Sequence, residues 1–334
     1  YNELPYAQTV ARAFHTDHHE IIVRPEVGAL LSKLIWHLDE PMADSAFITT
    51  YLVSKLASES VKVILSGVGG DELFGGYRRY LGHNLLPYYR WLPDPVRTKW
   101  LPGLLAKLPR DRHSKWQNYS RLASAFVDSA ALPADLRYEG YVTIFAPEAR
   151  DQLLKNGASK AYASGDDPVA GTLKKYFGRC SSADHLNQIL YVDIKTSLAD
   201  DLLTLTDKMT MATAIESRAP FVDHELVQLT SRMPSNLKVR GWTMKYLLKK
   251  VVKPWLPKEI LQRRKRGFGA PMGAWLRRDL GALMNETLNE EQVRRRGLFD
   301  WQVVHDTIVS HEARRNDYTD HLLALINLEL WCRL

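Results

Sequence analysis

Residues 61–80 read VKVILSGVGGDELFGGYRRY, and this stretch decides the fold of the 334-residue chain. The apolar run at 61–66 ends abruptly at a cluster of glycines, which is the pattern of a buried strand followed by a tight corner. In open parallel sheets, ligands bind beyond the carboxyl ends of the strands, where turns without side chains let backbone amides approach them. The stretch therefore predicts a strand, a glycine corner and a helix that together face a ligand.

The glycine corner has the properties of an anion site. Gly67, Gly69 and Gly70 permit close approach of the backbone and the positive φ angles of a sharp turn, and the N-terminus of the next helix stabilises a nearby anion by roughly 0.3–1 kcal/mol. Two carboxylates, Asp71 and Glu72, stand at this site. A bridging Mg²⁺ would bind carboxylate oxygen on one side and phosphate oxygen on the other, which makes Asp71 the best candidate metal ligand. The spacing equally allows both carboxylates to serve only as caps of the helix.

The N-terminal part of the chain predicts a truncated α/β layer. Helices are expected at about 4–14, 26–37 and 45–59, and strands at 19–23 (HEIIV) and 61–66. Strands that alternate with helices of this length indicate parallel βαβ units in a doubly wound sheet. Because two parallel strands do not form a stable sheet alone, we expect the rest of the layer on the N-terminal side of Tyr1, in a longer polypeptide.

The character of the chain changes after about residue 84. Leu, Ala, Trp, Arg and Lys then dominate, and the pattern from about 115 to the end is helical. Prolines should break the start of this region into short pieces; they are Pro87, Pro93, Pro95, Pro102 and Pro109. We expect a truncated α/β part at 1–84 and a mostly helical part at 85–334 that packs on it.

Composition and charge limit the class of protein. Hydrophobic residues make up 45% of the chain and charged residues 25%, as in soluble globular proteins. No apolar run approaches the roughly 20 residues that cross a bilayer, so a cytoplasmic location without membrane contact is expected. The net charge of +7 suits a nucleic acid or a polyanionic small molecule. The basic runs at 263–266 and 294–296 lack interleaved aromatics that stack bases, which favours solvated or phosphate-facing clusters and argues against a nucleic-acid partner.

Two later segments carry further candidate residues. The segment 199–223, ADDLLTLTDKMTMATAIESRAPFVD, threads acidic residues through an apolar helical pattern, and Glu216 with Arg218 is expected to form an ion pair on a helix. The segment 261–271, LQRRKRGFGAP, places Lys265 just before a Gly-Phe-Gly turn. A lysine on such a turn supplies a point charge to a polyphosphate, although a solvated basic loop is the commoner explanation.

Five segments, in order along the chain, resemble the synthetase domain of glutamine-hydrolysing asparagine synthetases. They are YNELPYAQTVARAFHTDHHE (1–20), HLDEPMADSAFITTYLVSKLA (37–57), VILSGVGGDELFGGYRRY (63–80), DIKTSLADDLLTLTDKMTMATAIESRAPFVDHEL (193–226) and MKYLLKKVVKPWLPKEILQRRKRGFGAPMGAWL (244–276). The resemblance implies an ATP pyrophosphatase fold, with a truncated Rossmann-like parallel sheet of the adenine nucleotide alpha hydrolase type. It also implies a reaction in which the side-chain carboxylate of aspartate attacks the α-phosphate of ATP, pyrophosphate leaves, and ammonia from glutamine then displaces AMP to form asparagine.

The resemblance assigns roles to residues of the glycine corner and to two residues beyond it. Ser66 and Gly67, in one loop with Gly69 and Gly70, are implied to contact ATP. Asp71 is implied to hold Mg²⁺ pyrophosphate. Lys265 is implied to neutralise pyrophosphate, and Asp201 to lie near the acyl centre as an acid, a base or an orienting group.

The chain departs from the family pattern in two ways. Val68 stands where well-known members have glutamate, which leaves the acceptor carboxylate open. The SGGxDS pyrophosphate loop and the glutaminase domain that supplies ammonia lie outside the chain, so the chain alone is expected to be inactive. Alternatives are a relative that amidates a glycan or secondary-metabolite carboxylate or closes a β-lactam, and a non-catalytic member of the family; a homodimer also stays open.

Overall fold

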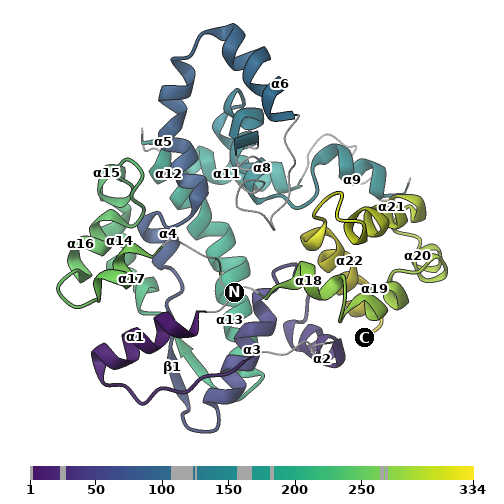
Figure 1. The fold of residues 1–334 in the computed structure, drawn as a ribbon, viewed down its shortest axis with the longest axis horizontal. Helices are drawn as coiled ribbons and strands as arrows, with labels where there is room; N and C mark the ends of the chain where they lie inside the picture. Colours follow the sequence, from purple (N-terminus) through teal and green to yellow (C-terminus); the bar gives the residue numbers. More distant parts are fainter. Residues whose placement is uncertain are drawn as a thin grey trace. The chain divides into compact units, whose positions relative to one another are not determined.

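A computed structural model describes residues 3–22, 28–106, 123–124, 126–155, 168–180, 184–263, 267 and 270–334 (Figure 1). The chain forms two compact units, each of them discontinuous in sequence. The first contains Tyr1–Leu81, Leu186–Met272 and Leu334, and the second contains Gly82–His185 and Gly273–Arg333. Lys265 and Val23 lie outside the described residues.

The first unit holds a parallel sheet of two strands. β1 (Val63–Leu65) pairs with β2 (Glu216–Arg218), with Val63 opposite Glu216 and Leu65 opposite Arg218. The α-helices of this unit are α1 (Leu4–Phe14), α2 (Gly28–Leu38), α3 (Ala46–Ala57), α4 (Gly70–Phe74), α12 (His185–Asp193), α13 (Thr204–Met211), α14 (His224–Ser231), α15 (Ser235–Lys238), α16 (Tyr246–Val252) and α17 (Lys258–Gln262). A π-helix, η2 (Ile194–Leu203), joins α12 to α13, and a 3-10 turn, η3 (Pro220–Val222), follows β2.

The core of the first unit lies where α2, α3 and α13 pack together. On α2 the buried side chains are Leu31, Leu34, Ile35 and Leu38, which is the i, i+3, i+4, i+7 spacing of one helix face. Burial of each such side chain contributes roughly 1.5–3 kcal/mol. The sequence-predicted helices at 4–14, 26–37 and 45–59 are confirmed as α1, α2 and α3, apart from residues 26 and 27, which are not described.

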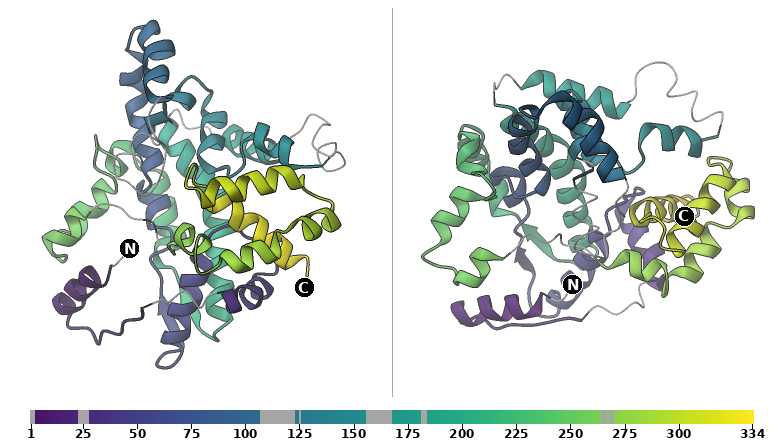
Figure 2. Two further views of the ribbon diagram at one scale, coloured as in Figure 1. Left: turned by 45° about the vertical axis from the view of Figure 1, so that its right-hand side comes forward. Right: turned by 45° about the horizontal axis from the view of Figure 1, so that its top comes forward.

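The expected strand at 19–23 is wrong for residues 19–22. Figure 2 shows the stretch after α1 as an extended trace, and no described strand pairs with it. Ile22 is largely exposed. A strand is stabilised by its ladder of hydrogen bonds and by cross-strand packing, so an apolar stretch without a neighbour stays irregular.

The acidic segment 199–223 does not form one continuous helix. Helix α13 ends at Met211, Ala214 adopts a left-handed φ of 56°, and Glu216–Arg218 forms β2. The expected ion pair between Glu216 and Arg218 is confirmed. It forms on a strand, where residues two apart point to the same face, and not on a helix.

The second unit is mostly helical in its described part, with one isolated β-bridge between Leu154 and Phe299. It contains the larger part of α5 (Arg78–Arg90), followed by η1 (Val96–Trp100), α6 (Leu101–Ala106), α8 (Ala134–Val142), α9 (Pro147–Leu153), α11 (Pro168–Arg179), α18 (Met272–Leu276), α19 (Gly281–Thr287), α20 (Glu290–Arg296), α21 (Trp301–Glu312) and α22 (Thr319–Trp331). Pro87, one of the five prolines expected to break this region into short pieces, lies inside α5. The helix continues because Leu86 and Tyr89, on both sides of the proline, are buried in the core of this unit.

Membrane insertion through a helix is not supported: within the described ranges, every helix is too short or too polar to span a bilayer.

Truncation of a core residue on α3 tests the packing of the first unit. Ile48 is fully buried, so we expect Ile48→Ala to lower the free energy of unfolding by about 2–5 kcal/mol. Val53 lies on the same helix with 43% of its surface exposed, and Val53→Ala should change stability by no more than about 0.5 kcal/mol. Urea unfolding of the intact chain measures both changes. Equal effects of the two substitutions would contradict the packing of α3 against α13.

Candidate functional site

The glycine corner follows β1 directly, as the sequence predicts. The amide of Ser66 donates to the carbonyl oxygen of Arg218 at 2.7 Å, which extends the pairing with β2 by one residue. The amide of Val68 then donates to the Ser66 hydroxyl at 3.3 Å, and α4 begins at Gly70. The corner is therefore held by the end of the sheet. Because α4 has only five residues, its dipole makes a small contribution to anion binding.

Two glycines of the corner differ in their surroundings. Gly69 has a φ of +93°, and a Cβ atom there would lie 2.8 Å from Cγ2 of Val222, so both backbone conformation and space require glycine. Around Gly67, no described atom lies within 4 Å of the Cβ position. The backbone at Gly67 is therefore open to an approaching ligand.

Asp71 forms an ion pair with Lys245, a residue that was not singled out in the sequence. The Lys245 Nζ and Asp71 Oδ1 atoms are 3.0 Å apart. The side chain of Lys245 is 25% exposed and that of Asp71 is 19% exposed, so both are largely buried. Lys245 has a φ of 53° and precedes α16. A Cβ atom at Gly76 would overlap Asp71 Oδ1 and Lys245 Cε. The second glycine pair of the motif thus provides the space in which this ion pair forms.

Glu72 has a different role from Asp71. Its side chain is 1% exposed, and the Tyr77 hydroxyl donates a hydrogen bond to Glu72 Oε1. Burial, together with the negative charge of Glu72, raises the pKa of Tyr77 far above its usual range, so the phenol keeps its proton. Of the two adjacent carboxylates, Asp71 faces a cation and Glu72 faces a hydroxyl.

A buried network connects this corner to the helix that leads to Asp201. Asp193, which is fully buried, accepts a hydrogen bond from the Tyr80 hydroxyl and pairs with Arg79 at 2.7 Å. The Arg79 guanidinium also lies 4.3 Å from the centre of the Tyr77 ring. Since Asp193 directly precedes η2, the network fixes the start of η2 relative to the start of α5.

Asp201 lies near the end of η2 and is half-buried. Burial, and secondarily the negative charge of Asp44, raise the pKa of Asp201 to about 7. Asp44 itself accepts a hydrogen bond from the amide of Ala46 at the start of α3. A carboxyl group with a pKa close to neutrality can accept and donate a proton at physiological pH, which is the property of an acid–base catalyst.

The donor set around Asp71 fits a phosphate-bound Mg²⁺ ion better than a metal site made only of protein ligands. In the described part of the chain, no three His, Cys, Asp or Glu side chains gather to hold a metal. Mg²⁺ at nucleotide sites takes one or two carboxylates and completes its shell with water and phosphate oxygens. Asp71 meets that requirement as the single carboxylate of the corner that faces a cation.

The sequence-predicted basic positions are partly accounted for by ion pairs. Arg263 pairs with Glu3 and lies over the Tyr6 ring at 4.6 Å. In the 294–296 run, Arg294 pairs with Glu290 at 2.7 Å and Arg296 with Glu329 at 2.9 Å. These arginines are held by neighbours in the chain. Lys265 lies outside the described residues.

Alanine substitutions at Gly76, where a Cβ atom has no room, and at Gly67, where it has room, test the geometry of the corner. Gly76→Ala should lower the free energy of unfolding by about 1–3 kcal/mol, because the added methyl group overlaps the Asp71–Lys245 pair. Gly67→Ala is the matched control: it meets no described atom and should change stability by about 0.5 kcal/mol or less. Urea denaturation of both variants checks the difference. Equal stability of Gly76→Ala and the wild type would show that the space is not filled.

A pH titration of stability tests the environment of Asp201. Because the pKa of Asp201 in the folded chain is raised to about 7, above its unfolded value, the folded state binds the extra proton and loses stability as pH rises from about 4 to 7. Asp201→Asn removes this loss, so its stability relative to the wild type should be greater at pH 8 than at pH 5, by about 1.4 kcal/mol for each pH unit between pH 5 and the folded pKa. The exposed neighbour provides the control Asp200→Asn, which should show no such trend. A constant difference for Asp201→Asn would contradict the raised pKa.

Comparison with known proteins supports one family. Residues 1–333 match the family described as asparagine synthase. A glutamine-hydrolysing asparagine synthetase 1 of Bacillus subtilis is 33% identical over 87% of this chain and 44% of the relative. A putative glutamine-hydrolysing asparagine synthetase of Mycobacterium bovis is 30% identical over 99% of this chain and 48% of the relative, and the amidase chyE of Penicillium rubens is 23% identical over 92% and 47%. The chain spans less than half the length of these relatives.

Proposed function

Because this chain belongs to the asparagine synthase family, we propose that it carries the ATP-dependent synthetase site of an amidotransferase. In this proposal, a substrate carboxylate attacks the α-phosphate of ATP and pyrophosphate leaves. Ammonia then attacks the acyl carbon, AMP leaves, and the nitrogen loses a proton to form the amide. The observation that carries the proposal is the Asp71–Lys245 pair at the carboxyl end of β1, beside the open backbone of Gly67.

Lys245 and Asp71 would act on the pyrophosphate. Negative charge develops on the leaving pyrophosphate as the bond to the α-phosphorus breaks, so a cation fixed at that position stabilises the transition state more than the ground state. Lys245 Nζ is such a cation, held by Asp71 and by the space at Gly76. Mg²⁺ bound by Asp71 would neutralise further charge on phosphate oxygens. Lys265 is proposed as a second cation, on the basis of the family resemblance.

The backbone of the corner would hold ATP. Ser66 and Gly67 are proposed to contact the nucleotide, with Gly69 and Gly70 shaping the turn. The structure supports this role for two of these residues, Gly67 and Gly69. The open surroundings of Gly67 allow a phosphate to approach its backbone, and the left-handed Gly69 turns the chain back toward η3.

Asp201 is proposed to act as the base that accepts the proton lost by the attacking ammonia. A base is most effective when its pKa lies near the working pH, and the pKa of Asp201 is raised to about 7. Val68, where the resemblance predicts glutamate, has no titratable group, so it cannot share this task. Aspartate is the proposed acceptor, which makes asparagine the proposed product.

Sequence outside the 334 residues is proposed to complete the sheet and the reaction. Leu65 is 77% exposed and Val63 51% exposed on a sheet of two described strands. Parallel sheets are normally covered on both faces and contain more strands. We therefore propose a Rossmann-like sheet whose other strands, pyrophosphate loop and glutaminase domain belong to the rest of the polypeptide. That glutaminase would deliver ammonia to the site.

Pyrophosphate release tests the two charged residues in the full-length protein. Asp71→Asn and Lys245→Met should each lower aspartate-dependent pyrophosphate release by about 100-fold or more, because each removes a charge at the leaving group. Lys253→Met, at an exposed lysine in the turn after α16, is the matched control and should keep wild-type activity.

The same assay separates errors in the proposal. Wild-type release by Asp71→Asn or Lys245→Met would show that the site is assigned to the wrong residues. Release that depends on ammonia but not on aspartate would show that the acceptor is another carboxylate. The isolated 334-residue chain should not exchange labelled pyrophosphate into ATP, and robust exchange would show that the outer pyrophosphate loop is dispensable.

A further inference from the structure

The second unit buries a guanidinium group that has no acidic partner in the described part of the chain. Arg137, on α8, is 4% exposed. Its Nη1 atom is inaccessible to solvent and makes no hydrogen bond, and its side chain forms no ion pair with a described residue. A buried charge without compensation destabilises a protein strongly, so buried arginines are normally paired. Arg137 therefore has the position of an internal ligand-binding group.

Two histidines of the second unit lie against each other on helices other than α8, and one of them, His83, follows Gly82, whose Cβ position is 3.6 Å from the hydroxyl of Tyr141 on α8. His83 is on α5 and His185 begins α12, and their ring centres are 5.3 Å apart at an interplanar angle of 66°. His83 Nδ1 is buried and, among described atoms, has no hydrogen-bond partner. Burial and the positive charges of neighbouring groups, Arg137 among them, lower the pKa of His83 to about 4, with Asp184 acting in the opposite direction. At neutral pH, His83 is therefore an uncharged imidazole with a free polar atom.

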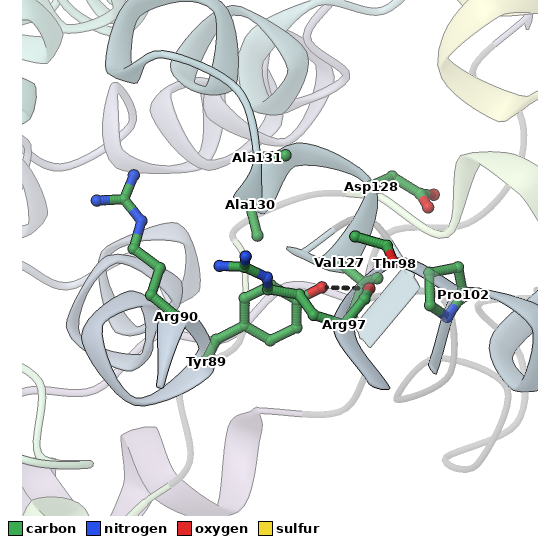
Figure 3. Close-up of a pocket in the computed structure, with 9 residues that line it drawn as sticks. All are labelled: Tyr89, Arg90, Arg97, Thr98, Pro102, Val127, Asp128, Ala130 and Ala131. Atoms are coloured by element: carbon green, nitrogen blue, oxygen red, sulfur yellow. Dashed lines mark hydrogen bonds between the residues drawn. The ribbon is translucent and has the colours of Figure 1, made fainter. Parts of the chain in front are cut away.

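Arg90 adds a second guanidinium group to this cluster. It is seven residues after His83, two turns along α5, and therefore lies on the same helix face. Its charge acts on both His83 and Arg137. Arg90 also borders a cavity of about 470 Å³, but Figure 3 shows its guanidinium pointing away from Tyr89 and Arg97 of that cavity. Arg97 is paired with Asp94, whereas Arg90 has no acidic partner in the described ranges.

The hydroxyl of Tyr141, which acts on Arg137, already has a hydrogen-bond partner. The hydroxyl groups of Tyr141 and Ser129 are hydrogen-bonded to each other at 2.9 Å. Tyr141 also lies close to α5, since a Cβ atom at Gly82 would be 3.6 Å from its hydroxyl. This arrangement shows that α8 and α5 approach each other beside His83. It leaves the donors of Arg137 without a protein acceptor among the described residues.

We propose that Arg137, His83, His185 and Arg90 form a binding site for a phosphate dianion inside the second unit. A planar guanidinium group offers paired donors that match phosphate oxygens. Two guanidinium charges balance the two negative charges of the dianion, and a neutral imidazole can donate a further hydrogen bond without excess charge. The ligand supplies the negative charge that no described residue provides in an ion pair with Arg137. Free phosphate and the phosphate end of a small ester share this chemistry, and the site is independent of the function proposed for the first unit.

Thermal unfolding of the intact 334-residue chain in inorganic phosphate tests the site at pH 7.5, with sodium chloride added to constant ionic strength. Phosphate should raise the Tm of the wild type in a saturable way, because a ligand that binds only the folded state stabilises it by mass action. Arg137→Met should bind phosphate at least about tenfold more weakly, since a tenfold loss is the smallest expected for a bidentate charged contact. In phosphate-free buffer, Arg137→Met should be more stable than the wild type, because an unpaired buried charge has been removed.

Two further variants keep the test decisive. Arg90 is exposed, so Arg90→Gln should fold normally and weaken phosphate binding several-fold, even if Arg137→Met does not fold. Lys253→Met, at an exposed lysine of the first unit, should leave the phosphate response unchanged. A response lost in Lys253→Met but kept in Arg90→Gln would overturn the proposal, as would no saturable response in the wild type.

The choice of ligand is tested in the same assay. Acetate at equal ionic strength should give no comparable rise in Tm, and an equal rise would overturn the assignment to a dianion. Glycerol 3-phosphate separates the two sources of phosphate. A response to it like that to inorganic phosphate assigns the site to phosphate esters as well, and a response to inorganic phosphate alone assigns it to free phosphate.

Discussion

The ion pair between Asp71 and Lys245 forms in the space beside Gly76, where any other residue would place a side chain. Any side chain at Gly76 would overlap the charged groups of Asp71 and Lys245. Gly69 has a positive φ where the chain turns beside η3. The pairing of β1 with β2 fixes the backbone that leads into this corner. The hydrogen bond from Tyr77 to Glu72 connects α4 to the residues that follow the second glycine pair. The function proposed for the first unit rests on this one arrangement of backbone and charge.

Local patterns in the sequence predicted the N-terminal elements of the first unit, from α1 to α4. Helices α1, α2 and α3 follow from apolar spacing, and on α2 and α3 the buried residues repeat with the helical period. The strand after Val61 follows from β-branched residues that end in glycines. The same reasoning failed at 19–22 and at Glu216–Arg218, since a strand is defined by its neighbour in space, and the neighbour of β1 lies in a distant part of the sequence.

The partners of the site residues were harder to predict than the residues themselves. Asp71 and Asp201 were identified from motif and resemblance. Lys245, which pairs with Asp71, and Asp44, which acts on Asp201, come from segments far away in the chain. Their contacts depend on tertiary packing, for which local periodicity carries no signal. The sequence motif includes the glycine pair at 75–76, but only the structure shows that Gly76 leaves the space for the Asp71–Lys245 pair.

The discontinuity of the first unit has a consequence for the synthesis of the chain. β1 leaves the ribosome about 150 residues before β2, and all of Gly82–His185 is made between them. At about 5–20 residues per second, β2 is synthesised roughly 8–30 s after the apolar strand that contains Leu65. During that interval the backbone donors and acceptors on the edge of β1 that will pair with β2 are unpaired, which is the condition that favours misassembly and chaperone binding. The pairing of β1 with β2 therefore comes only after Gly82–His185 has been synthesised.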